Sequence, residues 1–94
     1  MNDARVVFRV HAIQRMFERR IGEVDVHHIL NTGEIIENYP NDTPYPSQLL
    51  LGWREDRPLH VVAANNTADN ERIIITVYEP DPDQWESDFK RRKP

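Results

Sequence analysis

An amphipathic stretch near the start of the chain, His11 to Ile21 with the sequence HAIQRMFERRI, constrains the fold more than any other. In a helix with about 100° per residue, four large apolar side chains share one side: Ile13, Met16, Phe17 and Ile21. This stripe predicts a helix that packs on a hydrophobic core. The helix should run from about His11 to Arg20, because Gly22 interrupts the pattern.

The same helix carries a second row of side chains. His11, Arg15 and Arg19 recur at every fourth position, so they drift only about 40° per step around the helix. The row is cationic and holds one titratable ring. Its place on the wheel, roughly opposite Ile13, leaves two interpretations open, which are a solvated surface and the edge of a cleft.

Composition limits what such a helix can belong to. The 94 residues, 38% of them hydrophobic, suit a single domain over residues 1–94, with residues 89–94 as a basic tail. With no cysteine in the chain, disulfides and thiolate zinc sites are excluded. No apolar run approaches the roughly 18 residues that span a bilayer, and no signal peptide is recognisable, so we expect a cytoplasmic protein without membrane contact.

A formal charge of −4 argues against a protein that grips nucleic acid over its whole surface. The charge is patterned, however. Arginines cluster in the first helix, and Lys90 to Lys93 is wholly basic. Any contact with RNA is therefore expected at those two places.

Downstream of the first helix, the pattern predicts a second helix and four strands. Val6 to Val10 suits a short strand or an extended lead-in. The other expected elements are a helix over Glu23 to Leu30, with Val24, Ile29 and Leu30 inward and Gly33 just past its end, and strands over Glu34 to Tyr39, Gln48 to Arg54, Leu59 to Ala64 and Arg72 to Glu79. Three prolines stiffen the loop before Ser47.

The end of the chain carries a helix-start signature. Asp81 stands at the N-cap position, Pro82 at the first helical position and Gln84 where a capping box needs a polar side chain. Trp85 and Phe89 would then pin a short C-terminal helix to the core. The order of elements predicts an α+β fold, with an N-terminal helical hairpin packed on a mainly antiparallel sheet of about four strands.

Four motifs together resemble the domain-of-unknown-function 4258 family of small prokaryotic proteins. They are His11-Ala12-x-x-Arg15-Met16-x-x-Arg19-x-Ile21, Gly33-Glu34-Ile35-Ile36-Glu37-x-Tyr39, Leu59-His60-Val61-Val62, and Thr76-Val77-Tyr78-Glu79-Pro80 with Trp85. The resemblance covers nearly the whole chain. It implies a RelE-like, metal-independent endoribonuclease that acts as the toxin of a type II toxin–antitoxin pair. The implied partners are an RNA substrate and an antitoxin of the zinc-ribbon or helix-turn-helix type.

Two departures from that pattern are visible. Toxins that cleave messenger RNA on the ribosome tend to be basic, whereas this chain is acidic, which confines RNA contact to the helix row and the tail. Arg20 stands where relatives often have glycine, so the turn after the first helix is expected to differ.

The residues offer a matching chemical kit. Cleavage of RNA without a metal or cofactor needs a base, an acid and cations that stabilise the phosphorane. His11 and His60 suit base and acid because imidazole titrates near pH 6.5. Arg15 and Arg19 could clamp phosphate oxygens, and Tyr78 could donate a hydrogen bond or stack on a base.

Each of these residues also has an ordinary structural explanation. His60 suits a half-buried position in a sheet, Tyr78 suits a core, and Arg15 can pair with Glu18 one turn on. Two other functions therefore stay open, namely a non-catalytic protein-binding module of the same fold and a metal-dependent hydrolase. A basic cleft that holds both His11 and His60 would favour the ribonuclease, and separation of the two rings by the sheet would favour the binding module.

Overall fold

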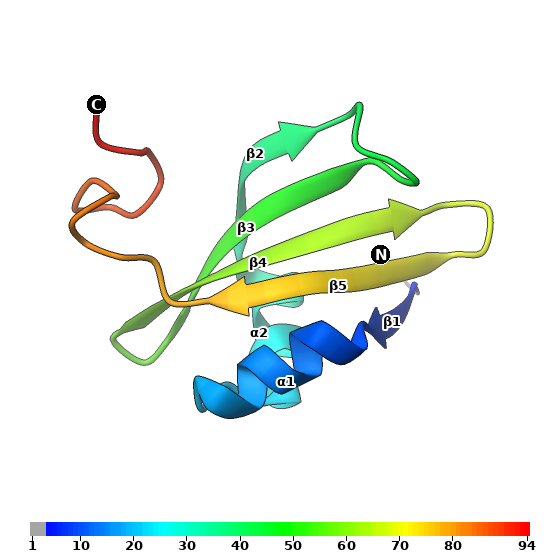
Figure 1. Cartoon of the computed structure of the whole chain (residues 1–94), viewed down its shortest axis with the longest axis horizontal. Helices are drawn as coiled ribbons and strands as arrows, with labels where there is room; N and C mark the ends of the chain where they lie inside the picture. The colour runs from blue at the N-terminus through cyan, green and yellow to red at the C-terminus, as the bar shows by residue number, and fades with distance from the viewer. Residues whose placement is uncertain (1–3) are drawn as a thin grey trace.

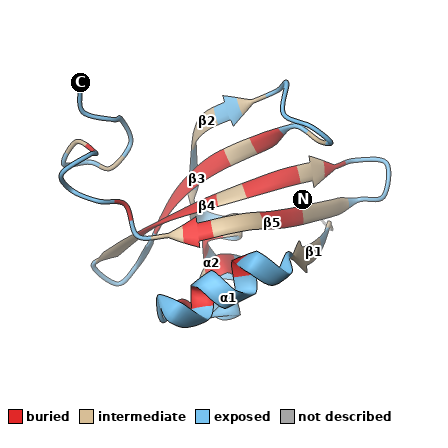
Figure 2. Ribbon diagram, in the orientation of Figure 1, coloured by how far each residue is buried: buried red, intermediate tan, exposed pale blue. Residues whose placement is uncertain are grey.

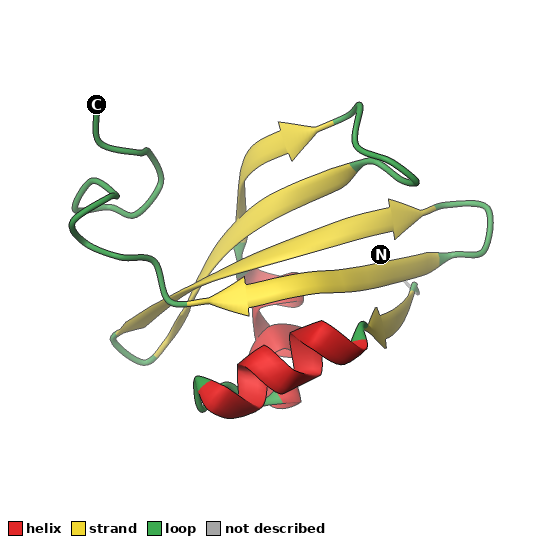
Figure 3. Ribbon diagram, in the orientation of Figure 1, coloured by secondary structure: helices red, strands yellow, loops and turns green. Residues whose placement is uncertain are grey.

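A computed structural model describes residues 4–94, which form two helices and a five-stranded sheet (Figure 1). The elements in chain order are β1 (Arg5–Phe8), α1 (Val10–Glu18), α2 (Glu23–Thr32), β2 (Glu34–Tyr39), β3 (Ser47–Arg54), β4 (Arg57–Asn66) and β5 (Glu71–Tyr78). The strand order across the sheet is β1-β5-β4-β3-β2. Both helices lie on one side of the sheet, and the long segment after β5 lies on the other side (Figure 3).

The predicted α+β class is confirmed, but the sheet differs from the expected one. The pairs β2–β3, β3–β4 and β4–β5 are antiparallel, as predicted, whereas β1 adds a fifth strand parallel to β5. The edge of β5 would otherwise leave its backbone N–H and C=O groups unpaired. Val6 and Phe8 also pack against the core, so the short N-terminal strand gains both hydrogen bonds and apolar burial.

The predicted apolar stripe of the first helix is confirmed in part, because Met16 and Ile21 are buried as expected. Ala12 and Met16 face the core, while Ile13 is 45% and Phe17 is 86% exposed. The wheel also placed Ile13 and Phe17 inward, but the buried side of α1 is formed by Ala12 and Met16, and α1 packs on β5. A small residue lets a helix backbone approach its neighbour closely, and here this contact decides the orientation.

The helix α2 packs on β3 by close approach as well. Val26 and Ile29 are fully buried, whereas Val24, predicted to point inward, is 80% exposed. Gly52 on β3 makes room for Ile29, since a Cβ atom added to Gly52 would lie 2.4 Å from Ile29 Cγ1. Gly33 ends α2, as predicted. Because α1 packs on β5 and α2 on β3, the expected helical hairpin does not pack as one unit.

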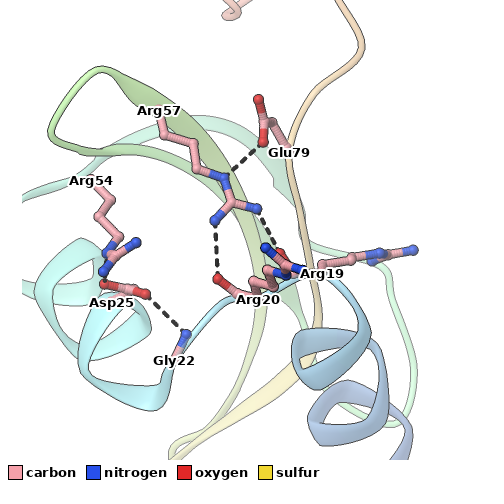
Figure 4. A network of polar contacts seen from close by, with 7 residues as sticks. All are labelled: Arg19, Arg20, Gly22, Asp25, Arg54, Arg57 and Glu79. Atoms are coloured by element: carbon pink, nitrogen blue, oxygen red, sulfur yellow. Dashed lines mark hydrogen bonds and ion pairs between the residues drawn. The ribbon is translucent and has the colours of Figure 1, made fainter.

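The corner between the two helices is tied by polar contacts (Figure 4). Arg57 donates hydrogen bonds to the carbonyl oxygens of Arg19 at 2.7 Å and Arg20 at 3.0 Å, and it pairs with Glu79 at 2.8 Å. These bonds satisfy carbonyl groups that the end of α1 leaves without helical partners. Asp25 accepts a hydrogen bond from the Gly22 N–H and so caps the start of α2.

The predicted C-terminal helix is wrong, because residues 79–94 contain no helix (Figure 3). The Asp81 side chain accepts a hydrogen bond from the Asp83 N–H, and the Asp81 carbonyl accepts one from the Trp85 N–H. This makes a single turn, after which the chain reverses. Glu86 and Arg91 pair through their backbones instead.

Two aromatic side chains hold this C-terminal segment, residues 79–94, against the sheet. Trp85 is 3% exposed and packs on His60, and the Phe89 ring meets Trp53 edge-on at 6.0 Å. Both faces of the central strands are therefore covered, which agrees with the run of buried residues along β3, β4 and β5 (Figure 2). Burial of these two rings stabilises the C-terminal segment in place of the hydrogen bonds that a helix would have made.

Candidate functional site

Alternation along β4 sends neighbouring side chains to opposite faces of the sheet. Leu59 and Val61 join the core beneath the helices. His60 lies between them in the sequence and points to the other face, where it meets Tyr78 and Trp85. The imidazole is fully buried there, and not half-buried as the strand pattern suggested.

The hydrogen bonds of His60 fix the position of its proton. Its Nε2 lies 2.8 Å from the carbonyl oxygen of Phe89, and its Nδ1 lies 3.2 Å from the hydroxyl of Tyr78. A carbonyl oxygen can only accept a hydrogen bond, so Nε2 must carry the proton. In the neutral ring, Nδ1 then accepts the hydrogen bond that the Tyr78 hydroxyl donates.

Burial supports the neutral form of this ring. Loss of solvent lowers the pKa of His60 below its ordinary value of 6.5, and the charge of Arg92 lowers it further. The bond to the Phe89 carbonyl and the charge of Glu37 act in the opposite direction but are outweighed. His60 is therefore an uncharged base at neutral pH.

Three more polar side chains share this environment. Glu37 and Tyr39 come from β2, and the Tyr39 hydroxyl donates a hydrogen bond to the Glu37 carboxylate at 2.5 Å. Burial and then this bond raise the pKa of Tyr39 to about 12. The Arg92 guanidinium stacks over Trp85, 4.6 Å from the ring centre.

Glu37 and Arg92 act electrostatically on both His60 and Tyr78. We call these five side chains the His60 cluster: Glu37, Tyr39, His60, Tyr78 and Arg92. The cluster combines a neutral base, two phenols, a carboxylate and a guanidinium. These are the group types that acid–base chemistry at a phosphate requires.

Sequence reasoning found two members of the cluster and missed three. His60 and Tyr78 were predicted, and the structure places them side by side because their backbones pair across β4 and β5. Glu37 and Tyr39 are two residues apart in one strand, so alternation could have placed them on a common face. Nothing in the sequence placed Arg92 near them, since it arrives by the reversal of the C-terminal segment.

The other predicted site residues lie apart from the cluster. His11 and Arg15 are exposed on α1, on the opposite side of the sheet from His60 (Figure 1). Arg15 pairs loosely with Glu18 at 3.5 Å. The Arg19 guanidinium donates a hydrogen bond to the Val77 carbonyl at 2.7 Å, which ties α1 to β5.

Two further observations concern only residues 4–94. No three His, Asp or Glu side chains in this part of the chain gather closely enough to hold a metal ion. Within the same residues, neither helix has the length and apolar character needed to cross a membrane.

The fold and the His60 cluster define a small α+β domain with a polar centre on the sheet face away from its helices. Its family follows from a comparison with family models, in which the domain of unknown function DUF4258 matches residues 8–79. The chain belongs to this family. Searches of curated proteins and of solved structures found no match.

Proposed function

We propose that the chain is a metal-independent endoribonuclease of the RelE-like class, the toxin of a type II toxin–antitoxin pair, with the His60 cluster as its catalytic centre. The observation that carries this proposal is the neutral, buried imidazole of His60 bonded to Tyr78 and set between the charges of Glu37 and Arg92. A histidine whose pKa is shifted by burial and by charged partners is typical of catalytic sites.

The chemistry needs His60 in its second tautomer. With the proton on Nδ1, where the Tyr78 oxygen accepts it, Nε2 is free to take the proton of a ribose 2′-hydroxyl. The 2′-oxygen attacks phosphorus and the bond to the 5′-oxygen breaks, which leaves a 2′,3′-cyclic phosphate. Tyr78 gives its proton to the leaving 5′-oxygen and regains one from His60 Nδ1.

This sequence of transfers is balanced in protons. It returns His60 to the tautomer that carries the proton on Nε2, which is the one bonded to Phe89 in the structure. The guanidinium of Arg92 supplies the positive charge that stabilises the phosphorane. Glu37 holds Tyr39 in place and offsets the charge of Arg92.

Substrate access requires the C-terminal segment to move, because the Phe89 carbonyl occupies Nε2. Beyond the buried Trp85, the contacts of the segment with the rest of the domain include the exposed ion pair of Lys90 with Glu34 at 3.1 Å and the ring contact of Phe89 with Trp53. Exposed ion pairs contribute little, so local opening costs far less than unfolding. The segment would then close over bound RNA and bring Arg92 back.

Induced expression in a bacterial host tests the proposal. We expect growth arrest by the wild type and by His11→Gln, and no arrest by His60→Gln. Glutamine can still donate a hydrogen bond to the Phe89 carbonyl, so the fold is kept while the base is lost. His11→Gln is the matched control because His11 lies on α1, away from the cluster. Arrest by a folded His60→Gln variant would contradict the proposal.

A second candidate function, the protein-binding module, is favoured by a different observation. The His11 and His60 rings lie on opposite sides of the sheet, and α1 exposes an apolar row on its surface: Val10, Ile13 and Phe17. Monomeric proteins rarely leave large apolar residues together in solvent unless a partner covers them. The same growth assay separates the two functions. If Phe17→Glu no longer arrests growth while His60→Gln still does, the protein-binding module is established instead.

A further inference from the structure

Arg72, at the start of β5, is held in an unusual way for an arginine. Its side chain is half-buried, and its Nε atom is buried without a hydrogen-bond partner among the residues that the structure describes. Its Nη2 makes a long hydrogen bond of 3.4 Å to Gln48 Oε1. Gln48 in turn donates to Asn38 at 3.1 Å, so a polar row crosses the sheet from β5 to β2.

The guanidinium lines a cavity of about 400 Å³ at the end of the sheet where the β2–β3 and β4–β5 loops meet. Most of the surface of the cavity is apolar, and five of the residues that line it carry side-chain amides: Asn38, Gln48, Asn65, Asn66 and Asn70. One acid, Glu71, also reaches the cavity, but it is already paired with Arg5. The charge of Arg72 is therefore left for another partner.

This arrangement costs free energy unless a ligand completes it. A buried N–H donor of a cation that lacks an acceptor destabilises the fold. Burial also lowers the pKa of Arg72 below the ordinary value, which agrees with an incompletely compensated charge. A guanidinium carries its N–H donors in a plane, and such a planar group matches two oxygens of a phosphate.

We propose that this cavity binds a compact organic phosphate monoester of the size of a nucleoside monophosphate, with the phosphate on Arg72 and the polar remainder against the amides. Side-chain amides both donate and accept hydrogen bonds, as the edges of a nucleobase do. The volume lies at the small end of ligand cavities, so a single nucleotide fits better than a dinucleotide. The site is formed by Gln48 and Arg72, which are no part of the His60 cluster, and it does not depend on the proposed ribonuclease activity.

Nuclear magnetic resonance of the wild-type protein provides the first test. The protein is titrated with uridine monophosphate and, separately, with inorganic phosphate while the Arg72 Nε–H and the side-chain amides of Asn38 and Gln48 are followed. We expect saturable shifts with both probes and a Kd at least about tenfold lower for the nucleotide, because the amides add bonds that phosphate alone cannot make. No saturable shift, or a nucleotide Kd no lower than that of phosphate, would overturn the proposal.

Matched variants give the second test. Arg72→Gln should lose the increase in Tm that uridine monophosphate gives the wild type, whereas Arg9→Gln, which removes an exposed arginine, should keep it. An equal increase in Arg72→Gln would show binding elsewhere and refute the site. The titration of the wild-type protein tests the site without any variant, so it decides the proposal even if Arg72→Gln misfolds.

Discussion

Replacement of Gly52 by alanine tests the packing of α2 on the sheet, and the sign of the effect is informative. Without close contacts, Gly→Ala in a strand should stabilise the protein by about 0.5–1 kcal/mol. Here the new Cβ atom would lie 2.4, 2.8 and 3.0 Å from Ile29 Cγ1, Cγ2 and Cβ. Carbon atoms normally pack at roughly 3.5–4.0 Å, so α2 must retreat by about 1 Å.

Rotation of the Ile29 side chain cannot relieve this clash, because Ile29 Cβ is itself too close. Overpacking of this kind costs about 1–3 kcal/mol, and we expect a loss in Tm of about 5–15 °C. Thermal unfolding followed by circular dichroism measures it. A Tm equal to or above the wild-type value would refute the packing argument.

A double-mutant cycle with Ile29→Ala gives an independent test of the same contact. The single change Ile29→Ala should destabilise by about 2–5 kcal/mol, because it leaves a cavity in the core. The new methyl group of Gly52→Ala would partly fill that cavity. The double variant should therefore be more stable than additivity predicts, by at least about 1 kcal/mol, and strict additivity would show that the two side chains do not meet.

Three further predictions concern the cluster, the helix corner and α1. The free energy of unfolding of the wild type should fall as the pH drops below about 6.5, because the unfolded chain binds a proton that buried His60 resists. This fall should exceed that of His60→Gln by up to about 1.4 kcal/mol per pH unit. Equal pH profiles of the two proteins in urea titrations would contradict this prediction. Arg57→Met should lower the free energy of unfolding by about 1–2 kcal/mol in the same titrations, since two carbonyls at the end of α1 and Glu79 lose a charged partner. An unchanged free energy of unfolding would show that Arg57 does not stabilise the corner between the helices. Phe17→Glu should change stability by less than about 0.5 kcal/mol because Phe17 is 86% exposed, and a Tm drop of 10 °C would show that the helix face is packed.

The sequence pattern predicted the strands β2 to β5 to within two residues at each end. β-Branched residues are frequent in β2, β4 and β5, and β3 carries a run of three leucines. Local signals of this kind survive folding. The orientation of α1 was predicted correctly for Met16 and wrongly for Ile13 and Phe17, because a wheel weights large apolar residues, whereas the buried side also includes the small residue Ala12. Close backbone approach is a property of the partner strand and is not visible in the helix sequence.

Two other features depended on contacts between distant segments. A bulge in the β4–β5 pairing at Val62 and Ala63 turns Ile74 toward the helices, although unbroken alternation places it on the face of Tyr78. The reversal after Trp85 brings Arg92 over the ring, although the capping residues before it predict a helix. Capping chemistry specifies one turn, and tertiary packing of Trp85 decides the course of the chain beyond that turn.

The residues of the candidate site also depended on contacts between distant segments. His60 and Tyr78 were predicted from residue type, and cross-strand pairing joined them. His11, Arg15 and Arg19 were grouped with them by chemistry alone. Whether a helix row and a strand histidine share a cleft is set by which face of the sheet the helix covers, and α1 covers the face opposite His60.

Cleavage of RNA by the purified protein is the most direct test of the proposed ribonuclease activity. A labelled RNA is incubated with the wild type, His60→Gln and His11→Gln, with and without ribosomes, in the presence of a metal chelator, and the product ends are analysed. We expect 2′,3′-cyclic phosphate ends, a rate loss of about 10²–10⁴-fold for His60→Gln and no loss for His11→Gln. A folded His60→Gln variant that cleaves as fast as the wild type, or no cleavage under any of these conditions, would contradict the account.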